Sequence, residues 1–94
     1  MYTKKVHEAR SVLVVGAGVV GVETAAELGH LFNGKKKIGL CVRGDRLLPT
    51  IVPKAGQISE KFLKEKGVTI HYKTSYTEAF SAKEGYEVVI QCTG

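Results

Sequence analysis

The sequence is poor in the residues that build metal-bound or cross-linked domains. Only two of its 94 residues are cysteines, and Cys41 and Cys92 lack the Cys-x-x-Cys spacing of zinc sites and thioredoxin-like redox pairs. His7, His30 and His71 are scattered, without the spacing of metal ligands or a nearby nucleophile. We therefore expect no metal site, no redox pair and no catalytic histidine, and we expect both thiols to be buried and reduced.

Long hydrophobic runs are also missing. No apolar stretch approaches the roughly 20 residues that span a membrane, and residues 1–10 are too polar for a secretory signal. With 44% hydrophobic and 24% charged residues, the composition is that of one small globular domain. We expect no direct membrane contact from this segment, and the sequence assigns no compartment.

Positive charge is in excess, but it selects no partner by itself. The net charge is +5, and the densest basic run is residues 35–37. No aromatic residues interleave these lysines, as a nucleic-acid stacking surface would require. We therefore favour a solvated turn over a binding patch at this run, and we expect no nucleic-acid partner.

Strand and helix patterns alternate along the chain. Residues 11–15 (SVLVV) form a β-branched apolar run, typical of a parallel strand buried on both faces. Residues 19–32 change to a helical period, which ends at Asn33-Gly34. Residues 37–42 are a second strand candidate. Pro53 then opens a second helix, with Ala55, Ile58, Phe62 and Leu63 as its predicted apolar stripe and Gly67 at its end.

The remaining pattern completes the predicted fold. Residues 68–72 and 86–92 are expected strands, and residues 76–80 are a weaker strand candidate. The order of elements predicts an α/β, Rossmann-like three-layer domain with a central parallel sheet. We expect residues 1–10 to be a lead-in segment and residues 11–94 to be the domain.

A glycine motif joins the first strand to the first helix, with the spacing G-x-G-x-x-G. Gly16 permits a tight turn, Gly18 lets the backbone approach a pyrophosphate, and Gly21 lets the helix pack closely on the strand. The free N–H groups at the helix start then favour phosphate. A plain turn without a ligand would not repay the backbone entropy of three glycines. We expect the cofactor to contact the whole motif: Gly16, Ala17, Gly18, Val19, Val20 and Gly21.

The end of the second strand bears on the choice between NADH and NADPH. An NAD-selective fold places an acid about 20 residues beyond the motif to bind the adenosine ribose. Val42 stands at that place, Arg43 follows, and the nearest acid is Asp45. The Arg43 guanidinium can pair with a 2′-phosphate, which favours NADPH, or it can simply point into solvent. Glu23 is either a favourable charge near the helix start or a group that faces the nicotinamide.

Four segments together resemble a known family. They are residues 12–28 (VLVVGAGVVGVETAAEL), 42–49 (VRGDRLLP), 62–71 (FLKEKGVTIH) and 88–94 (VVIQCTG). In order and spacing they resemble the NAD(P)H-binding domain of the pyridine-nucleotide-disulfide oxidoreductase superfamily, and most nearly its type II NADH dehydrogenase and apoptosis-inducing-factor-like branch. The resemblance covers residues 11–94.

The resemblance implies roles for individual residues. It implies that the domain is inserted into an FAD-binding domain of a longer chain, which is then its partner. The motif glycines would hold the pyrophosphate, and Glu23 would lie near the nicotinamide. The turn at Val42 and Arg43 would meet the adenosine ribose. The final segment, Cys92, Thr93 and Gly94, would pass near the cofactor.

The chain departs from the family pattern in three places. The acid common after the second strand in NADH-using members is absent. Val19 stands where glutathione-reductase-like members often carry an aromatic gate. The segment 81–87 is shorter than the usual antiparallel crossover, so we expect one face of the sheet to be less well covered.

We therefore expect an NAD(P)H-binding domain that presents nicotinamide to the FAD of its parent enzyme for hydride transfer. Because it has one nucleotide motif and no redox pair, the isolated domain should bind dinucleotide weakly and catalyse nothing. One alternative is that the glycine loop holds the adenosine of FAD. The other is a regulatory module that senses NAD(H) without catalysis. An FAD motif, or a channel or repressor, in the neighbouring sequence would separate the enzyme from the sensor.

Overall fold

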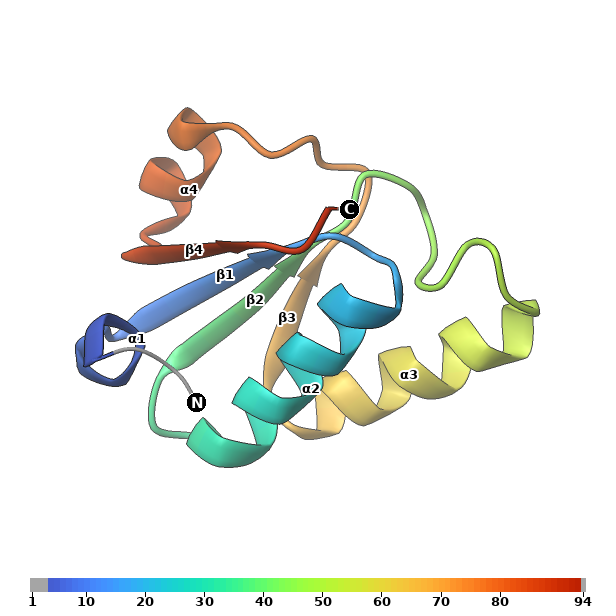
Figure 1. Ribbon diagram of the computed structural model, residues 1–94, viewed down its shortest axis with the longest axis horizontal. Helices are drawn as coiled ribbons and strands as arrows, with labels where there is room; N and C mark the ends of the chain where they lie inside the picture. The colour runs from blue at the N-terminus through green and yellow to red at the C-terminus, as the bar shows by residue number, and fades with distance from the viewer. Residues whose placement is uncertain (1–3, 94) are drawn as a thin grey trace.

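Four parallel strands form the centre of the computed structural model, which describes residues 4–93 (Figure 1). The strands are β1 (Ser11–Val15), β2 (Lys37–Cys41), β3 (Val68–His71) and β4 (Val88–Gln91), in the spatial order β3-β2-β1-β4. β1 is central, with Val12 beside Ile38 of β2 and beside Val88 of β4. Each strand lies within its predicted range, and the predicted parallel sheet is confirmed.

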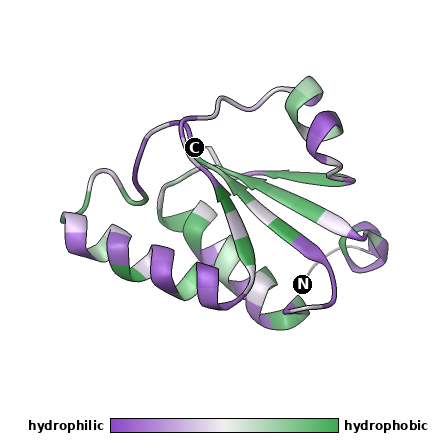
Figure 2. Ribbon diagram, turned by 180° about the vertical axis from the view of Figure 1, so that it is seen from behind, coloured by the Kyte–Doolittle hydropathy of each residue, from purple (hydrophilic) through white to green (hydrophobic). Residues whose placement is uncertain are grey.

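Helices cover both faces of this sheet, as predicted for a three-layer domain. α2 (Val19–Phe32) and α3 (Pro53–Glu65) lie side by side on one face, and the short α4 (Glu78–Glu84) lies on the other (Figure 1). Alternate residues of a strand point to opposite faces. Val12 and Val14 therefore pack in the large core cluster with α2 and α3, whereas Leu13 and Val15 pack in a smaller cluster beside Phe80 of α4. Figure 2 shows the strands as mainly hydrophobic.

Aromatic side chains cover the face of the sheet beneath α4. Tyr86 covers Gly39 so closely that a Cβ on this glycine would overlap the phenol ring. Its hydroxyl oxygen lies 2.7 Å from Nε2 of His71, whose ring also packs edge-on against Phe80. Burial lowers the pKa of His71 and raises the pKa of Tyr86 to about 12. Tyr86 thus covers the sheet at Gly39, and Tyr76, Phe80 and Val89 pack against the same cluster.

The prediction of a strand over residues 76–80 is wrong. Residues 78–84 form α4, which begins because the Thr77 hydroxyl accepts a hydrogen bond from the Phe80 N–H at 3.0 Å. Gly85 ends the helix in the left-handed conformation, with φ 80°. A hydroxyl cap and a glycine stop therefore override the apolar pattern of this segment.

The lead-in segment is not unstructured. Residues 4–8 form the short helix α1 (Lys4–Glu8), in which Val6 is buried. The Lys36 ammonium donates to the carbonyl oxygens of Val6 at 2.8 Å and His7 at 3.0 Å, and it lies 3.9 Å from the centre of the Phe32 ring. Lys37 likewise donates to the carbonyl oxygen at Glu84, at the end of α4. Lys35 and Lys37 are exposed, as predicted for a solvated turn, but the Lys36 and Lys37 ammonium groups also satisfy carbonyl groups at helix ends.

The predicted apolar stripe of α3 does not face the core as a whole. Leu63 is fully buried, but Ile58 is 61% exposed and Phe62 is 42% exposed. Gly56 of the same helix packs closely against the loop after β2, where a Cβ would lie 2.5 Å from the Leu47 carbonyl oxygen. The outer part of the predicted stripe faces solvent.

No helix within residues 4–93 is long and apolar enough to cross a membrane. The same residues contain no cluster of three histidine, cysteine or acidic side chains that could hold a metal ion. Both cysteines are free thiols, and Cys41 is buried as predicted, whereas Cys92 is only half-buried. The two cysteines lie on opposite faces of the sheet, because Cys41 packs on the α4 side and Cys92 on the α2 side.

Candidate functional site

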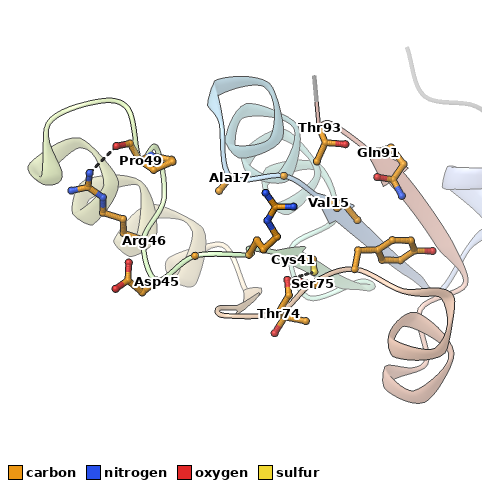
Figure 3. A pocket seen from close by; sticks show the side chains of 14 residues that line it. Val15, Ala17, Cys41, Asp45, Arg46, Pro49, Thr74, Ser75, Gln91 and Thr93 are labelled. Carbon is orange, nitrogen blue, oxygen red and sulfur yellow. Dashed lines mark hydrogen bonds between the residues drawn. The ribbon is translucent and has the colours of Figure 1, made fainter.

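A cavity of about 620 Å³ opens at the carboxyl ends of the strands (Figure 3). It is bounded by the ends of β1, β2 and β4 and by the loops that follow them. The chain passes from β1 to β2 and β3 on one side and then returns to β4 on the other side of β1. In open parallel sheets, this change of direction is where ligands bind.

The glycine turn forms one wall of the cavity. Gly16 has φ +130°, a conformation that other residues rarely adopt, and a Cβ there would lie 2.9 Å from the Cys92 carbonyl oxygen. The Gly16 N–H donates to the Cys41 carbonyl oxygen at 3.1 Å, and the Cys92 N–H donates to the Val15 carbonyl oxygen at 2.8 Å. The turn is therefore held against both neighbouring strand ends by backbone contacts alone.

The start of α2 has the properties of a phosphate site. Gly18 is the N-cap residue, and no side chain caps the helix. The first helical bond runs from the Val22 N–H to the Gly18 carbonyl oxygen at 3.0 Å, so the preceding amides lack helical acceptors. A Cβ on Gly18 would meet no atom within 4 Å. Open space in front of uncapped amides at the positive end of a helix fits a pyrophosphate.

Arg43 stands on a rigid turn at the opposite wall. The carbonyl oxygens of its two neighbours are both held, because the Thr74 N–H donates to Val42 at 3.0 Å and the Lys73 N–H donates to Gly44 at 2.8 Å. Lys73 adopts φ +52° in this arrangement. The Val42 side chain is fully buried in the core, whereas Arg43 is exposed and lines the cavity. Position 43, rather than 42, therefore presents the side chain that a ligand would meet.

The loop after β2 is braced against the glycine turn. The Leu48 N–H donates to the Ala17 carbonyl oxygen at 2.9 Å, and the Arg46 guanidinium donates to the Pro49 carbonyl oxygen at 2.7 Å. Figure 3 shows Asp45 and Arg46 at the end of the cavity far from Thr93. Arg46 is thus engaged within its own loop, whereas the Arg43 guanidinium makes no hydrogen bond or ion pair within residues 4–93.

A third wall was not predicted from the sequence. Thr74, Ser75 and Tyr76, between β3 and α4, line the cavity beside Cys41. The Cys41 thiol lies 3.4 Å from the Thr74 carbonyl oxygen, and burial raises its pKa. No motif marks this segment. Its position follows from the topology, because all parallel strands end at the same edge of the sheet.

The structure brings some of the predicted site residues together and separates others. Gly16, Ala17, Arg43 and Thr93 line the cavity, and Cys92 contacts Gly16 behind it. Gly18, Val19 and Val20 are exposed at the start of α2, and Gly21 packs against the turn. Val42 faces the core. Glu23 is exposed on a separate groove between α2 and α3. Gly94 lies outside the described residues.

Comparison with known proteins gives consistent matches. The family model described as pyridine nucleotide-disulphide oxidoreductase matches residues 2–94. The nitric oxide reductase FlRd-NAD(+) reductase of Aliivibrio fischeri is 35% identical over 86 residues, covering 90% of this chain and 22% of that protein. Oxidoreductase phnG of Penicillium herquei is 32% identical over 91 residues, covering 84% of this chain and 22% of that protein.

A solved structure shares the fold. NDH2 from Plasmodium falciparum, determined in complex with NADH, aligns with a TM-score of 0.73 at 21% identity, over 90% of this chain and 22% of that chain. The chain therefore spans about a fifth of the length of the proteins that it matches. The superfamily predicted from the sequence is confirmed by the family match.

Proposed function

The chain belongs to the pyridine nucleotide-disulphide oxidoreductase family, and from this premise we propose that residues 11–94 are the NAD(P)H-binding domain of a larger FAD-dependent oxidoreductase. The observation that supports the proposal best is the start of α2, where uncapped amides face open space at Gly18. A dinucleotide pyrophosphate carries the negative charge that such a helix end stabilises.

The walls of the cavity suggest how the dinucleotide would lie. With its pyrophosphate at Gly16–Gly21, one end of the ligand would reach Arg43 and the other would reach Thr93 (Figure 3). We assign the adenosine to the Arg43 end and the nicotinamide to the Thr93 end. The bound cofactor would supply the hydride, and the chain would bind and orient it towards an FAD-binding domain. A role for Glu23 near the nicotinamide stays a prediction.

Arg43 makes NADPH an expected ligand. Its backbone is fixed on both sides by Lys73 and Thr74, so the side chain projects from a rigid turn. A guanidinium binds phosphate through parallel hydrogen bonds, and no carboxylate occupies position 43 to repel the 2′-phosphate. We propose that the domain binds NADPH at least as tightly as NADH.

Gly18→Asp tests the pyrophosphate site. The new carboxylate would fill the open space in front of α2 and repel the diphosphate, so we expect at least an approximately tenfold loss of affinity for both NADH and NADPH in calorimetric titrations. Aspartate is a good N-cap, and thus the fold should not be weakened. Unchanged affinity in the folded variant would refute this site.

The matched control is Ala79→Asp, which adds the same charge on the exposed surface of α4. We expect this variant to bind dinucleotide like the unmodified chain. We also expect the chain alone to oxidise no NAD(P)H, because one nucleotide site supplies no electron acceptor. Steady oxidation by the purified chain without an added flavoprotein would contradict this.

A further inference from the structure

One peptide group in the loop after β2, the group that joins Leu47 to Leu48, contacts two other elements at once. Its N–H donates to the Ala17 carbonyl oxygen in the glycine turn at 2.9 Å. Its carbonyl oxygen packs against Gly56 of α3, where a Cβ would lie only 2.5 Å away. Because the N–H and the C=O of a trans peptide point in opposite directions, this single group lies between α3 and the glycine turn.

The conformation of Leu48 indicates that its surroundings fix this peptide. Leu48 has φ +50°, in the left-handed region that is unfavourable for a leucine. Such a conformation persists only where the neighbouring structure determines it. Here the Leu47 side chain is buried in the core, and the Ile51 N–H donates to the Leu48 carbonyl oxygen at 3.0 Å. These contacts involve only the chain itself and need no ligand.

The bond to Ala17 sets the direction of the next amide in the glycine turn. The Ala17 carbonyl and the Gly18 N–H belong to one peptide, so the N–H points away from Leu48 when the carbonyl oxygen faces it. Within residues 4–93 the Gly18 N–H donates no hydrogen bond, and a Cβ on Gly18 would meet no atom within 4 Å. A free amide beside open space at the start of α2 is available to an anion.

We propose that Leu48 is a positioning residue for the pyrophosphate and that α3 acts on the cofactor site through it. This inference rests on the proposed function, because it requires that the glycine turn binds a dinucleotide. Gly56 fixes the Leu47–Leu48 peptide, and this peptide in turn fixes the Ala17–Gly18 peptide. A donor that is already oriented binds more tightly than one that must be ordered on binding. Neither Leu48 nor Gly56 lines the cavity, so their effect is indirect.

Gly56→Ala tests this relay in the full chain. The new methyl group would lie 2.5 Å from the Leu47 carbonyl oxygen, so the backbone there must shift. We expect the affinity for both NADH and NADPH to fall about three- to thirtyfold in calorimetric titrations. The amide resonance of Gly18 should also move in the ¹H–¹⁵N NMR spectrum of the unliganded chain, because the peptide that carries it has turned.

Gly29→Ala is the matched control. Gly29 is also a buried helical glycine, and a Cβ there would lie 2.8 Å from Cγ2 of Val68. The substitution therefore crowds the packing of α2 on β3 without contact to the loop after β2. We expect Gly29→Ala to lose stability, as Gly56→Ala does, but to keep its dinucleotide affinity and the resonance of Gly18.

An ester in place of the Leu47–Leu48 peptide removes the N–H and keeps every side chain. Such a chain can be assembled from two synthetic segments joined at Cys41. The control ester removes the Gly85 N–H, which donates to the Ala82 carbonyl oxygen at 3.1 Å at the end of α4. Each ester loses one backbone donor, but only the ester at Leu48 should weaken dinucleotide binding.

Unchanged dinucleotide affinity in Gly56→Ala or in the Leu48 ester, or an equal loss in their controls, would overturn the positioning role. An unmoved Gly18 resonance in Gly56→Ala would overturn it as well, and this measurement needs no ligand. If Gly56→Ala does not fold, the two esters decide. A chain that binds no dinucleotide would refute the proposed function instead, and the NMR comparison would still decide whether α3 orients the Gly18 amide.

Discussion

The Cα of Gly21 lies against the carbonyl oxygen of Gly16, so closely that a Cβ on Gly21 would overlap that oxygen. Gly18, three residues earlier, has open space at the same place. The same substitution should therefore have different effects at the two positions. We expect Gly21→Ser to lower the free energy of unfolding by about 1–3 kcal/mol. Gly18→Ser should leave it unchanged or raise it by a few tenths, roughly, because serine caps a helix.

Urea unfolding of the two serine variants measures this difference. Both variants replace glycine by serine and add the same side chain, so only the surroundings of that side chain differ. An equal loss of stability at both positions would show that α2 does not pack closely on the glycine turn.

Arg43 should decide the relative affinity for NADPH and NADH. If its guanidinium contacts the 2′-phosphate, Arg43→Ala removes charged hydrogen bonds worth about 1.5–3 kcal/mol. NADPH should then bind about ten- to a hundredfold more weakly, whereas the affinity for NADH should change little. Calorimetric titration of both dinucleotides measures the ratio.

Arg46→Ala is the control for that experiment. Arg46 also lines the cavity, but its guanidinium donates to the Pro49 carbonyl oxygen. We expect it to affect both dinucleotides equally and less strongly than Arg43→Ala affects NADPH. Equal losses for NADH and NADPH in Arg43→Ala would exclude recognition of the 2′-phosphate.

His71 should make the fold less stable in mild acid. Burial lowers its pKa in the folded state, so the unfolded chain binds the proton first as the pH falls. Its contribution to stability is therefore complete above about pH 6.5 and is lost as the pH falls through the folded pKa. Urea unfolding at neutral pH and in mild acid should show this loss, and His71→Asn should reduce it. An unchanged pH dependence in the variant would assign the effect to other groups.

Thr77 should be a small but measurable determinant of stability. Its hydroxyl accepts the Phe80 N–H at the start of α4, and α4 has only seven residues. We expect Thr77→Ala to lower the free energy of unfolding by about 1 kcal/mol, whereas Thr77→Ser keeps the cap and most of the stability. Thermal or urea unfolding compares the two variants. Equal losses would indicate that the lost methyl group, not the hydrogen bond, matters.

The elements that were predicted correctly have strong local signals. β1 is a continuous β-branched run, and α2 begins directly after the glycine motif and keeps its helical period to Phe32. The place of the glycine turn at the carboxyl edge of the sheet follows from these two elements. The three glycines also meet the contacts that their positions predict, since Gly16 and Gly21 are crowded and Gly18 is open.

The features that the sequence did not reveal depend on tertiary contacts. α1 is held by the Lys36 ammonium, a residue about thirty positions away along the chain. Part of the α3 stripe faces solvent, while Gly56 packs against the Leu47 carbonyl oxygen, a contact that no periodicity encodes. The wall at Thr74–Tyr76 carries no motif, and the bonds from Lys73 and Thr74 to the turn after β2 hold it at the site.

Those same bonds have a consequence for the evolution of cofactor choice. The turn around Arg43 is fixed entirely by main-chain groups of Val42, Gly44, Lys73 and Thr74, so its shape does not depend on which side chain stands at position 43. A single codon change there can exchange a guanidinium for a carboxylate while the scaffold stays as it is. Descendants of this domain could thus pass from one nucleotide pool of the cell to the other by a single amino-acid substitution.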